Sequence, residues 1–332
     1  MTPVAVKGIP TEVLVAPDSF KGTLSAGQVA EAVVRGLRAA GREACAMPVA
    51  DGGEGTLAAL APALGLVQRT MRVGDPLGRT IEAQLALGED AAVVETAAAS
   101  GLGLVRPAER DAMAASTAGT GELIVAAARS GARRILVAVG GSATTDGGRG
   151  AIEVIRRAGG LGGAKLVVLC DVRTPFEEAA RVFGPQKGAS PDQVGRLSRR
   201  LGQLARSYAR DPRGLPFTGA AGGLSGGLWA EFGAELVPGA AFVLDEIGFD
   251  ARMREARAVI TGEGRLDFQS LAGKAVAEVA TRCRQAGVPC HAVVGQLDLD
   301  LFNRRILDLQ RVLEAGTPAE LERAGSELAA AL

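Results

Sequence analysis

The sequence predicts two α/β domains, one of which is discontinuous and carries the other as an insertion. Near both ends of the chain, short apolar strands are followed by loops rich in glycine and aspartate and then by helices. This alternation of strand, loop and helix is typical of a parallel sheet. The middle of the chain instead alternates apolar and polar residues, as exposed strands do. A length of 332 residues also favours two domains over one.

The parallel-sheet domain is expected to be of the flavodoxin or Rossmann-like kind. Its first strand runs into a Pro-Asp-Ser-Phe-Lys-Gly loop, after which Ser25 and Gln28 form a capping-box pattern that starts a helix. A second strand leads through an Asp-Gly-Gly-Glu-Gly loop into another helix. The expected elements are strands over 12–16, 44–49, 258–260 and 291–294, and helices after the first two strands, over 272–286 and at the C-terminus.

The expected inserted domain has a mixed α/β character. Two alternating segments flank a Gly-Asp-Pro-Leu-Gly turn and predict a hairpin, and a third alternating segment follows. Its expected elements are strands over 68–73, 80–87, 92–96 and 134–139, a helix over 121–129, and two long glycine-rich stretches. We place the discontinuous domain at 1–72 and 255–332 and the inserted domain at 73–254.

Composition excludes several functional classes. The 37 basic and 37 acidic residues balance, and aromatics make up 3% of the chain, which argues against a nucleic-acid partner. One histidine, His291, excludes HExxH zinc sites, and its apolar setting predicts a buried strand residue. The four cysteines lack any metal-binding spacing and are expected to be reduced thiols. With neither a signal peptide nor a membrane helix expected, we predict a cytoplasmic protein without a membrane partner.

A glycine-rich loop over residues 140–148 is the strongest candidate for an anion site. Glycine accounts for 46 of 332 residues, about twice the usual frequency of roughly 7%. This loop follows a buried strand and precedes a helix, so its backbone amides and the helix N-terminus favour phosphate. The residues expected to bind there are Gly140, Gly141, Ser142, Thr144 and Asp146.

The common nucleotide-binding fingerprints are absent. The sequence has no GxGxxG, and the only Gly-Lys pair, at Lys274, lacks the other residues of a P-loop. A second glycine-rich stretch over 219–227 carries no charge. Either a ligand or close backbone packing explains Gly222 and Gly223 there, and both alternatives remain open.

Acidic residues follow several strands, where open α/β sheets bind ligands. The chain has only five lysines against 32 arginines, and three of the five lie in these loops. An ammonium group that neutralises phosphate is not interchangeable with a guanidinium, so glycine loops, lysines and carboxylates together predict phosphoryl transfer. The candidates are Asp18, Ser19 and Lys21; Asp51, Gly52, Gly53 and Glu54; Asp171 and Lys187; and Glu263, Arg265, Asp267 and Lys274. Lys7 and Lys165 lie outside such loops.

Six sequence blocks, in order and spanning most of the chain, resemble the bacterial glycerate kinase family. They are APDSFK at 16–21, PVADGGEGT at 48–56, GGSATTDGG at 140–148, VFGPQKGA at 182–189, AAGG at 220–223 and ITGEGRLD at 260–267. The resemblance implies phosphorylation of D-glycerate by ATP with Mg²⁺, in a cleft between two α/β domains.

The resemblance gives roles to the candidate residues. Asp18, Lys21, Asp171, Lys187 and Asp267 are the expected catalytic residues, the remaining candidates bind substrate or phosphate, and the metal ligands are not assigned. The chain departs from the family at Thr145, over 173–180, and between Gly150 and Cys170, where it is shorter. A kinase for another small hydroxy acid and a non-catalytic nucleotide- or acid-binding homologue are therefore the alternatives.

Overall fold

The computed structural model describes residues 11–332, and Lys7 lies outside them. The chain divides into two compact units, which we describe separately. The first consists of Met1–Val49 and Gly248–Leu332 and the second of Ala50–Ile247. The expected parallel-sheet and mixed α/β folds are both present.

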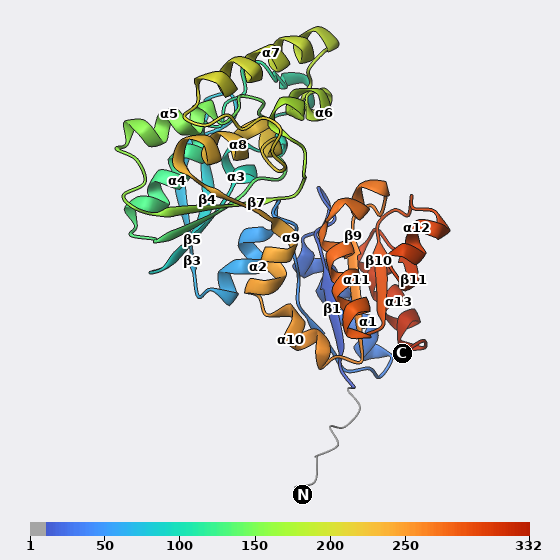
Figure 1. Cartoon of the computed structure of the whole chain (residues 1–332). Coiled ribbons are helices and arrows are strands. Elements are labelled where there is room, and N and C mark those ends of the chain that lie inside the picture. The colour runs from blue at the N-terminus through green and yellow to red at the C-terminus, as the bar shows by residue number, and fades with distance from the viewer. Residues whose placement is uncertain (1–10) are drawn as a thin grey trace, which may run out of the picture. The chain divides into compact units, whose positions relative to one another are not determined.

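The first unit is built on a five-stranded, fully parallel sheet in the order β11-β10-β9-β1-β2. Val13 of β1 pairs with Ala258 of β9, so Figure 1 shows the blue β1 beside the orange β9. Its strands are β1 (Val13–Pro17), β2 (Ala44–Ala46), β9 (Ala258–Glu263), β10 (Cys290–Val294) and β11 (Leu309–Glu314). Its helices are α1 (Ala26–Ala39), α10 (Phe249–Arg254), α11 (Ala275–Ala286), α12 (Leu301–Ile306) and α13 (Pro318–Ala329), with a 3₁₀ turn at Phe268–Ala272.

Apolar side chains of α1 and α13 pack on one face of this sheet. Val29 and Leu321 share a buried cluster with the strand residues Val13 and Ile260. The capping box of Ser25 and Gln28 starts α1 as predicted, because the Ser25 hydroxyl accepts from the Gln28 N–H while the Gln28 side chain accepts from the Ser25 N–H. Strand β11 was not predicted, and β2 ends three residues earlier than expected.

The second unit has a six-stranded mixed sheet in the order β3-β4-β5-β6-β7-β8. The predicted hairpin is confirmed as β3 (Val67–Gly74) and β4 (Thr80–Leu87), which pair antiparallel along their full length. Strand β5 (Ala91–Glu95) joins β4 antiparallel, and β5 to β8 run parallel. The other strands are β6 (Arg134–Ala138), β7 (Lys165–Cys170) and β8 (Glu235–Pro238).

Helices cover both faces of this sheet (Figure 1). On one face, α4 (Ala118–Arg129), α5 (Arg149–Arg157) and α8 (Ala220–Phe232) surround the core residues Val137 and Val168. On the other, α2 (Thr56–Ala63) and α9 (Gly239–Glu246) pack on Leu136 and Leu169. The unit also contains α3 (Thr96–Ser100), α6 (Ala179–Phe183) and α7 (Pro191–Ser207), and 3₁₀ turns at Leu102–Leu104, Pro107–Glu109, Phe176–Glu178 and Pro185–Lys187.

The two units divide at different residues from the expected domain boundaries of 72/73 and 254/255. Strand β3 pairs with β4 from Val67 onward, and Leu60 of α2 packs on this sheet, so residues 50–72 belong to the second unit. Helix α10 belongs to the first unit, where Asp250 pairs with Arg282 of α11. Side-chain packing, which a strand-by-strand reading of the sequence does not include, accounts for the shift.

Candidate active site

The predicted glycine-rich loop joins β6 to α5 in the second unit. Gly141, Gly147 and Gly148 adopt left-handed φ angles of 74°, 65° and 82°, which glycine tolerates without strain. At Gly140 a Cβ would lie 2.5 Å from the Cα of Gly53, so glycine is required by close backbone approach. The Gly140 N–H donates to the Gly52 carbonyl at 3.2 Å. The loops over 51–54 and 140–148 therefore lie in direct contact.

Asp146 organises this loop from inside. Its Oδ2 accepts hydrogen bonds from the Thr117 N–H and hydroxyl, both at 2.9 Å, and from the Gly150 N–H at 3.1 Å. Its Oδ1 accepts from the Gly148 N–H at 3.1 Å. One carboxylate thus joins the first turns of α4 and α5. Sequence reasoning expected Asp146 to bind phosphate, but four protein donors already surround it, so its place is structural.

Lys187 places a buried ammonium group against the same loop. Its Nζ donates to the Thr144 carbonyl at 2.6 Å and to the Ser142 hydroxyl at 3.0 Å. Burial lowers the pKa of Lys187 to about 8, and the carboxylates of Asp146 and Asp171 oppose this effect. The predicted lysine is therefore held beside the loop as a cation that has lost its water.

Several buried hydroxyl groups near the loop lack protein partners. Within residues 11–332, Thr144 Oγ1 and Thr145 Oγ1 are buried without a hydrogen bond, and so is Thr96 Oγ1, which follows β5. An unsatisfied buried hydroxyl costs roughly 1–3 kcal/mol. Three of them around one glycine loop, beside a buried lysine, are consistent with a site that completes its hydrogen bonds with a polar ligand.

Asp51 and Asp171 flank the loop. Asp51 is buried, and its Oδ1 accepts from the Gly53 N–H at 3.1 Å. Gly52 has a left-handed φ of 94°, and a Cβ there would lie 2.8 Å from the Leu169 carbonyl at the end of β7. Asp171 comes directly after β7, and its Oδ2 lies 3.1 Å from the position that a Cβ of Gly140 would take. Glu54 is exposed.

Glu95, at the end of β5, is a buried carboxylate at this edge that sequence reasoning did not select. Its Oε1 accepts from the Leu57 N–H at 2.7 Å and so caps the first turn of α2. Burial raises the pKa of Glu95, while N–H groups of Leu57, Gly55 and Thr56 oppose the rise. The signal was available, because Glu95 follows a strand just as the selected aspartates do.

The second glycine-rich stretch supports the first loop by packing. A Cβ on Gly222 would lie 2.0 Å from the Thr144 carbonyl, and one on Gly223 would lie 3.0 Å from the Gly147 Cα. Ala221, Gly222 and Gly223 all take left-handed φ angles and bend the start of α8. Close backbone contact accounts for both glycines, so of the two alternatives packing is the one that the structure supports.

The sequence departure over 173–180 also has a packing explanation. Phe176 is fully buried, its N–H donates to the Thr218 hydroxyl at 2.9 Å, and its ring lies edge-on to Tyr208. A Cβ on Gly226 would lie 2.6 Å from that ring. This stretch therefore belongs to the core behind the loop.

The remaining predicted residues lie at the carboxyl edge of the sheet in the first unit. Asp18 and Ser19 follow β1 and are buried, whereas Lys21 is exposed; the Asp18 Oδ1 accepts from the Ser19 N–H at 2.6 Å. Ser19 Oγ is a further buried hydroxyl without a partner in the described part of the chain. A Cβ on Gly264 would lie 3.1 Å from the Cα of Phe20, so the loops after β1 and β9 are adjacent.

Charged groups around the loop after β9 pair with one another and with the loop after β10. Lys274 Nζ lies 3.6 Å from Glu263 Oε2, which is buried at the end of β9. Arg265 is exposed and pairs with Asp298 at 2.6 Å and Asp267 at 3.7 Å. Asp267 also accepts from the Gln269 N–H at 2.9 Å and caps the 3₁₀ turn that follows. The first unit thus gathers Asp18, Ser19, Glu263, Arg265, Asp267 and Lys274 at one edge.

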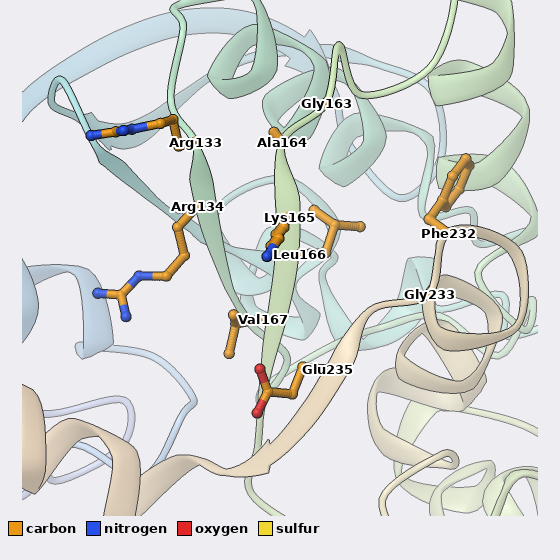
Figure 2. Close-up of a pocket in the computed structure, with 10 residues that line it drawn as sticks. All are labelled: Arg133, Arg134, Gly163, Ala164, Lys165, Leu166, Val167, Phe232, Gly233 and Glu235. Carbon is orange, nitrogen blue, oxygen red and sulfur yellow. The ribbon is translucent and has the colours of Figure 1, made fainter.

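Two hollows in the second unit lie away from the predicted loops. The one in Figure 2, of about 670 Å³, is lined by the first residues of β6, β7 and β8, including Arg134, Lys165 and Glu235. It lies at the opposite end of these parallel strands from the loops that carry Asp171 and Gly140. Arg134 pairs there with Glu246 at 2.9 Å.

The described residues set limits on metal and membrane binding. Across residues 11–332, no three histidine, cysteine or acidic side chains come together to hold a metal ion by themselves. In the same range, every helix is too short or too polar to cross a lipid bilayer.

Comparison with known proteins gives a consistent result over almost the whole chain. A family model described as "Glycerate kinase family" matches residues 13–156 and 155–330. A glycerate kinase of Halalkalibacterium halodurans is 38% identical, with 86% of this chain and 85% of that protein covered. The glycerate 2-kinase of Escherichia coli is 36% identical, with 87% and 86% covered. The crystal structure of a putative glycerate kinase 2 from Salmonella typhimurium superimposes with a TM-score of 0.80 and 32% identity, over 97% of this chain and 98% of that one.

The match to the family is interrupted at one place. Its two segments adjoin at residues 155–156, near the end of α5. The alignment with a glycerate kinase of Bacillus subtilis runs over 375 positions and covers 97% of this 332-residue chain, so roughly fifty positions have no residue here. This agrees with the shortening noted between Gly150 and Cys170.

Proposed function

The chain belongs to the glycerate kinase family, and from this premise we propose that it phosphorylates D-glycerate to phosphoglycerate with ATP. The observation that carries the proposal in the structure is the buried Lys187 ammonium, held against a glycine loop that keeps unpaired hydroxyls. A site with a desolvated cation and unsatisfied donors suits a phosphate group.

We assign phosphate binding to the loop over 140–148. Its backbone N–H groups and the Ser142 and Thr144 hydroxyls would donate to phosphate oxygens. Lys187 has three donors, two of which are directed to Ser142 and Thr144. Its positive charge would lower the energy of the transferred phosphoryl group, which carries several negative oxygens.

The carboxylates and the arginine complete the proposed chemistry. A kinase needs a base or orienting group for the attacking hydroxyl, and because the single histidine is buried in β10 we assign this role to a carboxylate. Asp18 is our candidate, because it is buried and directly follows β1. Asp267 is paired with Arg265 and caps a turn, so we assign it to positioning. Arg265, planar and exposed, is the proposed partner of the glycerate carboxylate.

Mg²⁺ is also part of the proposal. Magnesium in kinases is held by one or two carboxylates together with phosphate oxygens and water, so it does not require a closed protein cage. The carboxylates of the buried Asp51 and the half-buried Asp171, beside the glycine loop, fit this requirement and would hold the ion. When bound, it would neutralise charge on the phosphates.

A coupled assay of ADP release tests the proposal. With D-glycerate, ATP and Mg²⁺ we expect turnover that depends on all three, and ³¹P NMR of the product would show which hydroxyl is phosphorylated. Arg265→Ala should raise the KM for D-glycerate at least tenfold and leave the KM for ATP within threefold. Turnover no higher than background would overturn the proposed kinase activity. A higher kcat/KM for a different hydroxy acid would show that this acid, and not D-glycerate, is the substrate.

A further inference from the structure

Tyr208, the single tyrosine of the chain, contacts the glycine loop over 140–148. It directly follows α7, where the backbone leaves the helix and becomes extended, with φ −76° and ψ 157°. Its hydroxyl donates to the Gly147 carbonyl at 2.8 Å, although the two residues lie 61 positions apart in the sequence. Burial raises the pKa of Tyr208, so its hydroxyl keeps its proton and remains a hydrogen-bond donor.

Apolar packing holds the tyrosine ring in place. The ring lies edge-on to Phe176, with the two ring centroids 6.2 Å apart, and it packs against the buried cluster that contains Leu197. The loop backbone comes close to both rings, because a Cβ on Gly147 would lie 3.1 Å from the Phe176 ring and 3.2 Å from Tyr208 Oη. The hydroxyl is therefore directed at one carbonyl of the loop from a fixed position.

The peptide bond between Gly147 and Gly148 is hydrogen-bonded at both of its polar ends. Its carbonyl accepts from Tyr208, and its N–H, which belongs to Gly148, donates to Asp146 Oδ1 at 3.1 Å. Both glycines have left-handed φ angles, and a peptide between two glycines can rotate at little steric cost. Rotation would turn the Gly147 carbonyl toward the Asp146 carboxylate and remove one of its donors. The Tyr208 hydroxyl therefore stabilises the orientation in which Asp146 holds the loop.

A short series of backbone contacts connects this peptide to Lys187. The Gly147 N–H donates to the Gly222 carbonyl at 3.1 Å. Gly222 packs in turn on Thr144, whose carbonyl oxygen would lie 2.0 Å from a Cβ on Gly222. The same Thr144 carbonyl accepts from Lys187 Nζ at 2.6 Å. Because the contacts are this close, a displacement of Gly147 would reach the carbonyl that holds the buried ammonium group.

We propose that Tyr208 is a positioning residue, whose hydroxyl keeps the loop over 140–148 in the form that binds the phosphates of ATP. The inference rests on the proposed function and adds to it a residue that acts on phosphate only through Gly147. Without the hydroxyl, a smaller fraction of the molecules would hold the loop in the binding form, and the apparent affinity for ATP would fall in proportion. Saturating ATP would return the loop to the binding form, so kcat would be preserved.

Tyr208→Phe in the full chain tests the inference, because it keeps the ring and removes only the hydroxyl. We expect the KM for ATP, and the Kd of ATP and of tripolyphosphate by isothermal titration, to rise about fivefold, the effect of one hydrogen bond. Both kcat and the KM for D-glycerate should stay within about twofold of the wild type. The matched control is Ser207→Ala, which removes an exposed hydroxyl that donates to the Leu204 carbonyl at 2.8 Å and should leave all four constants unchanged.

Hydrogen–deuterium exchange separates positioning of the loop from a general loss of stability. In Tyr208→Phe, peptides that cover residues 140–150 should exchange at least about threefold faster, whereas peptides from β6 and from the first unit should exchange as in the wild type. A role confined to stability would instead speed exchange throughout the second unit. It would also lower kcat at an unchanged KM for ATP, because a smaller folded fraction reduces the rate and not the affinity.

Several outcomes would overturn the inference: an unchanged Kd of ATP or of tripolyphosphate in Tyr208→Phe, unchanged exchange of the loop, or an equal rise in Kd in Ser207→Ala. A wild-type chain that binds neither ATP nor tripolyphosphate would overturn it as well. Absence of turnover with D-glycerate, together with a fivefold weaker Kd in Tyr208→Phe, would overturn the proposed kinase activity and support the role of Tyr208. The titration and exchange readouts therefore distinguish failure of the inference from failure of the proposed function.

Discussion

Replacing Lys187 by methionine removes the buried ammonium and keeps most of the stem. Two effects on the free energy of unfolding then oppose each other. The hydrogen bonds to Ser142 and Thr144 are lost, and bonds to a charged group contribute about 1.5–3 kcal/mol each. The cost of burying the charge disappears as well, and the fall in the pKa of Lys187 from 10.5 to about 8 corresponds to roughly 3 kcal/mol.

The two lost bonds amount to roughly 3–6 kcal/mol and the relieved burial cost to roughly 3 kcal/mol, so the unfolding free energy of Lys187→Met in urea should lie within about 3 kcal/mol of the wild type. Its activity should fall much further. Loss of one buried donor to a developing charge typically costs roughly 10²–10³ in kcat. Lys187→Arg should also lose at least tenfold in kcat, because a planar guanidinium does not fit a space shaped for an ammonium. If Lys187→Met lowered the free energy of unfolding by more than about 4 kcal/mol and kept kcat within threefold of the wild type, the catalytic assignment would be refuted.

The pH dependence gives a second test of the same residue. The folded-state pKa of Lys187 lies below its unfolded value, so between about pH 8 and 10.5 the unfolded chain binds more protons. The contribution of Lys187 to unfolding free energy therefore rises with pH through this window, by roughly 3 kcal/mol. Activity should move the other way and fall above about pH 8, as the cation is lost. Comparing wild type with Lys187→Met across this pH range isolates the part of each trend that comes from Lys187. If the unfolding free energies of the two proteins changed with pH in parallel, the reasoning would be contradicted.

Three further predictions follow from the contacts of the loop and of β10. Asp146→Asn should lower the unfolding free energy by about 2–4 kcal/mol, measured in urea, because an amide nitrogen replaces an oxygen among four donors; a loss below 0.5 kcal/mol would contradict its structural place. Gly222→Ala should lower the free energy of unfolding by at least about 1–3 kcal/mol and raise the KM for ATP, because its Cβ would strike the Thr144 carbonyl. An unchanged KM would show that the packing of Gly222 does not affect the phosphate-binding loop. Burial, assisted by Arg311, lowers the pKa of His291, so its imidazole NMR signal should titrate below pH 6.5 and stability should decrease as pH falls through that range; a midpoint above 6.5 would refute this.

Much of the architecture could be predicted because local patterns agree with the fold. The hairpin of β3 and β4 shows its alternation and its Asp75 turn directly in the sequence. Strand β11 was missed, because its residues are only partly buried and its exposed arginine and glutamine obscure a strand pattern. The domain boundary moved because the packing of Leu60 on the second sheet is a long-range contact.

The residue types of the site could be predicted from the sequence, but which of them face a ligand and which hold the loop together could not. The scarcity of lysine singled out Lys187, and the structure shows it buried against the loop. Glycine content alone could not separate Gly141, which faces open space on its Cβ side apart from Ala97, from Gly222, which is packed against Thr144. Asp146 likewise looks in sequence like any other acid beside glycine. Only the donors around it show that it holds two helices together.

The position of β1 between β2 and β9 in its sheet bears on the order in which the chain folds during synthesis. Val13 pairs with Ala44 on one side and with Ala258 on the other. The edge that receives β9 therefore stays unpaired while the whole of Ala50–Ile247 is made, which takes roughly ten to forty seconds at about 5–20 residues per second. The second unit, continuous in sequence, can complete its own sheet in that interval. Ribosome-bound chains long enough for Ile247, but not β9, to have left the ribosome should thus contain a protected second unit and an exposed, chaperone-accessible β1.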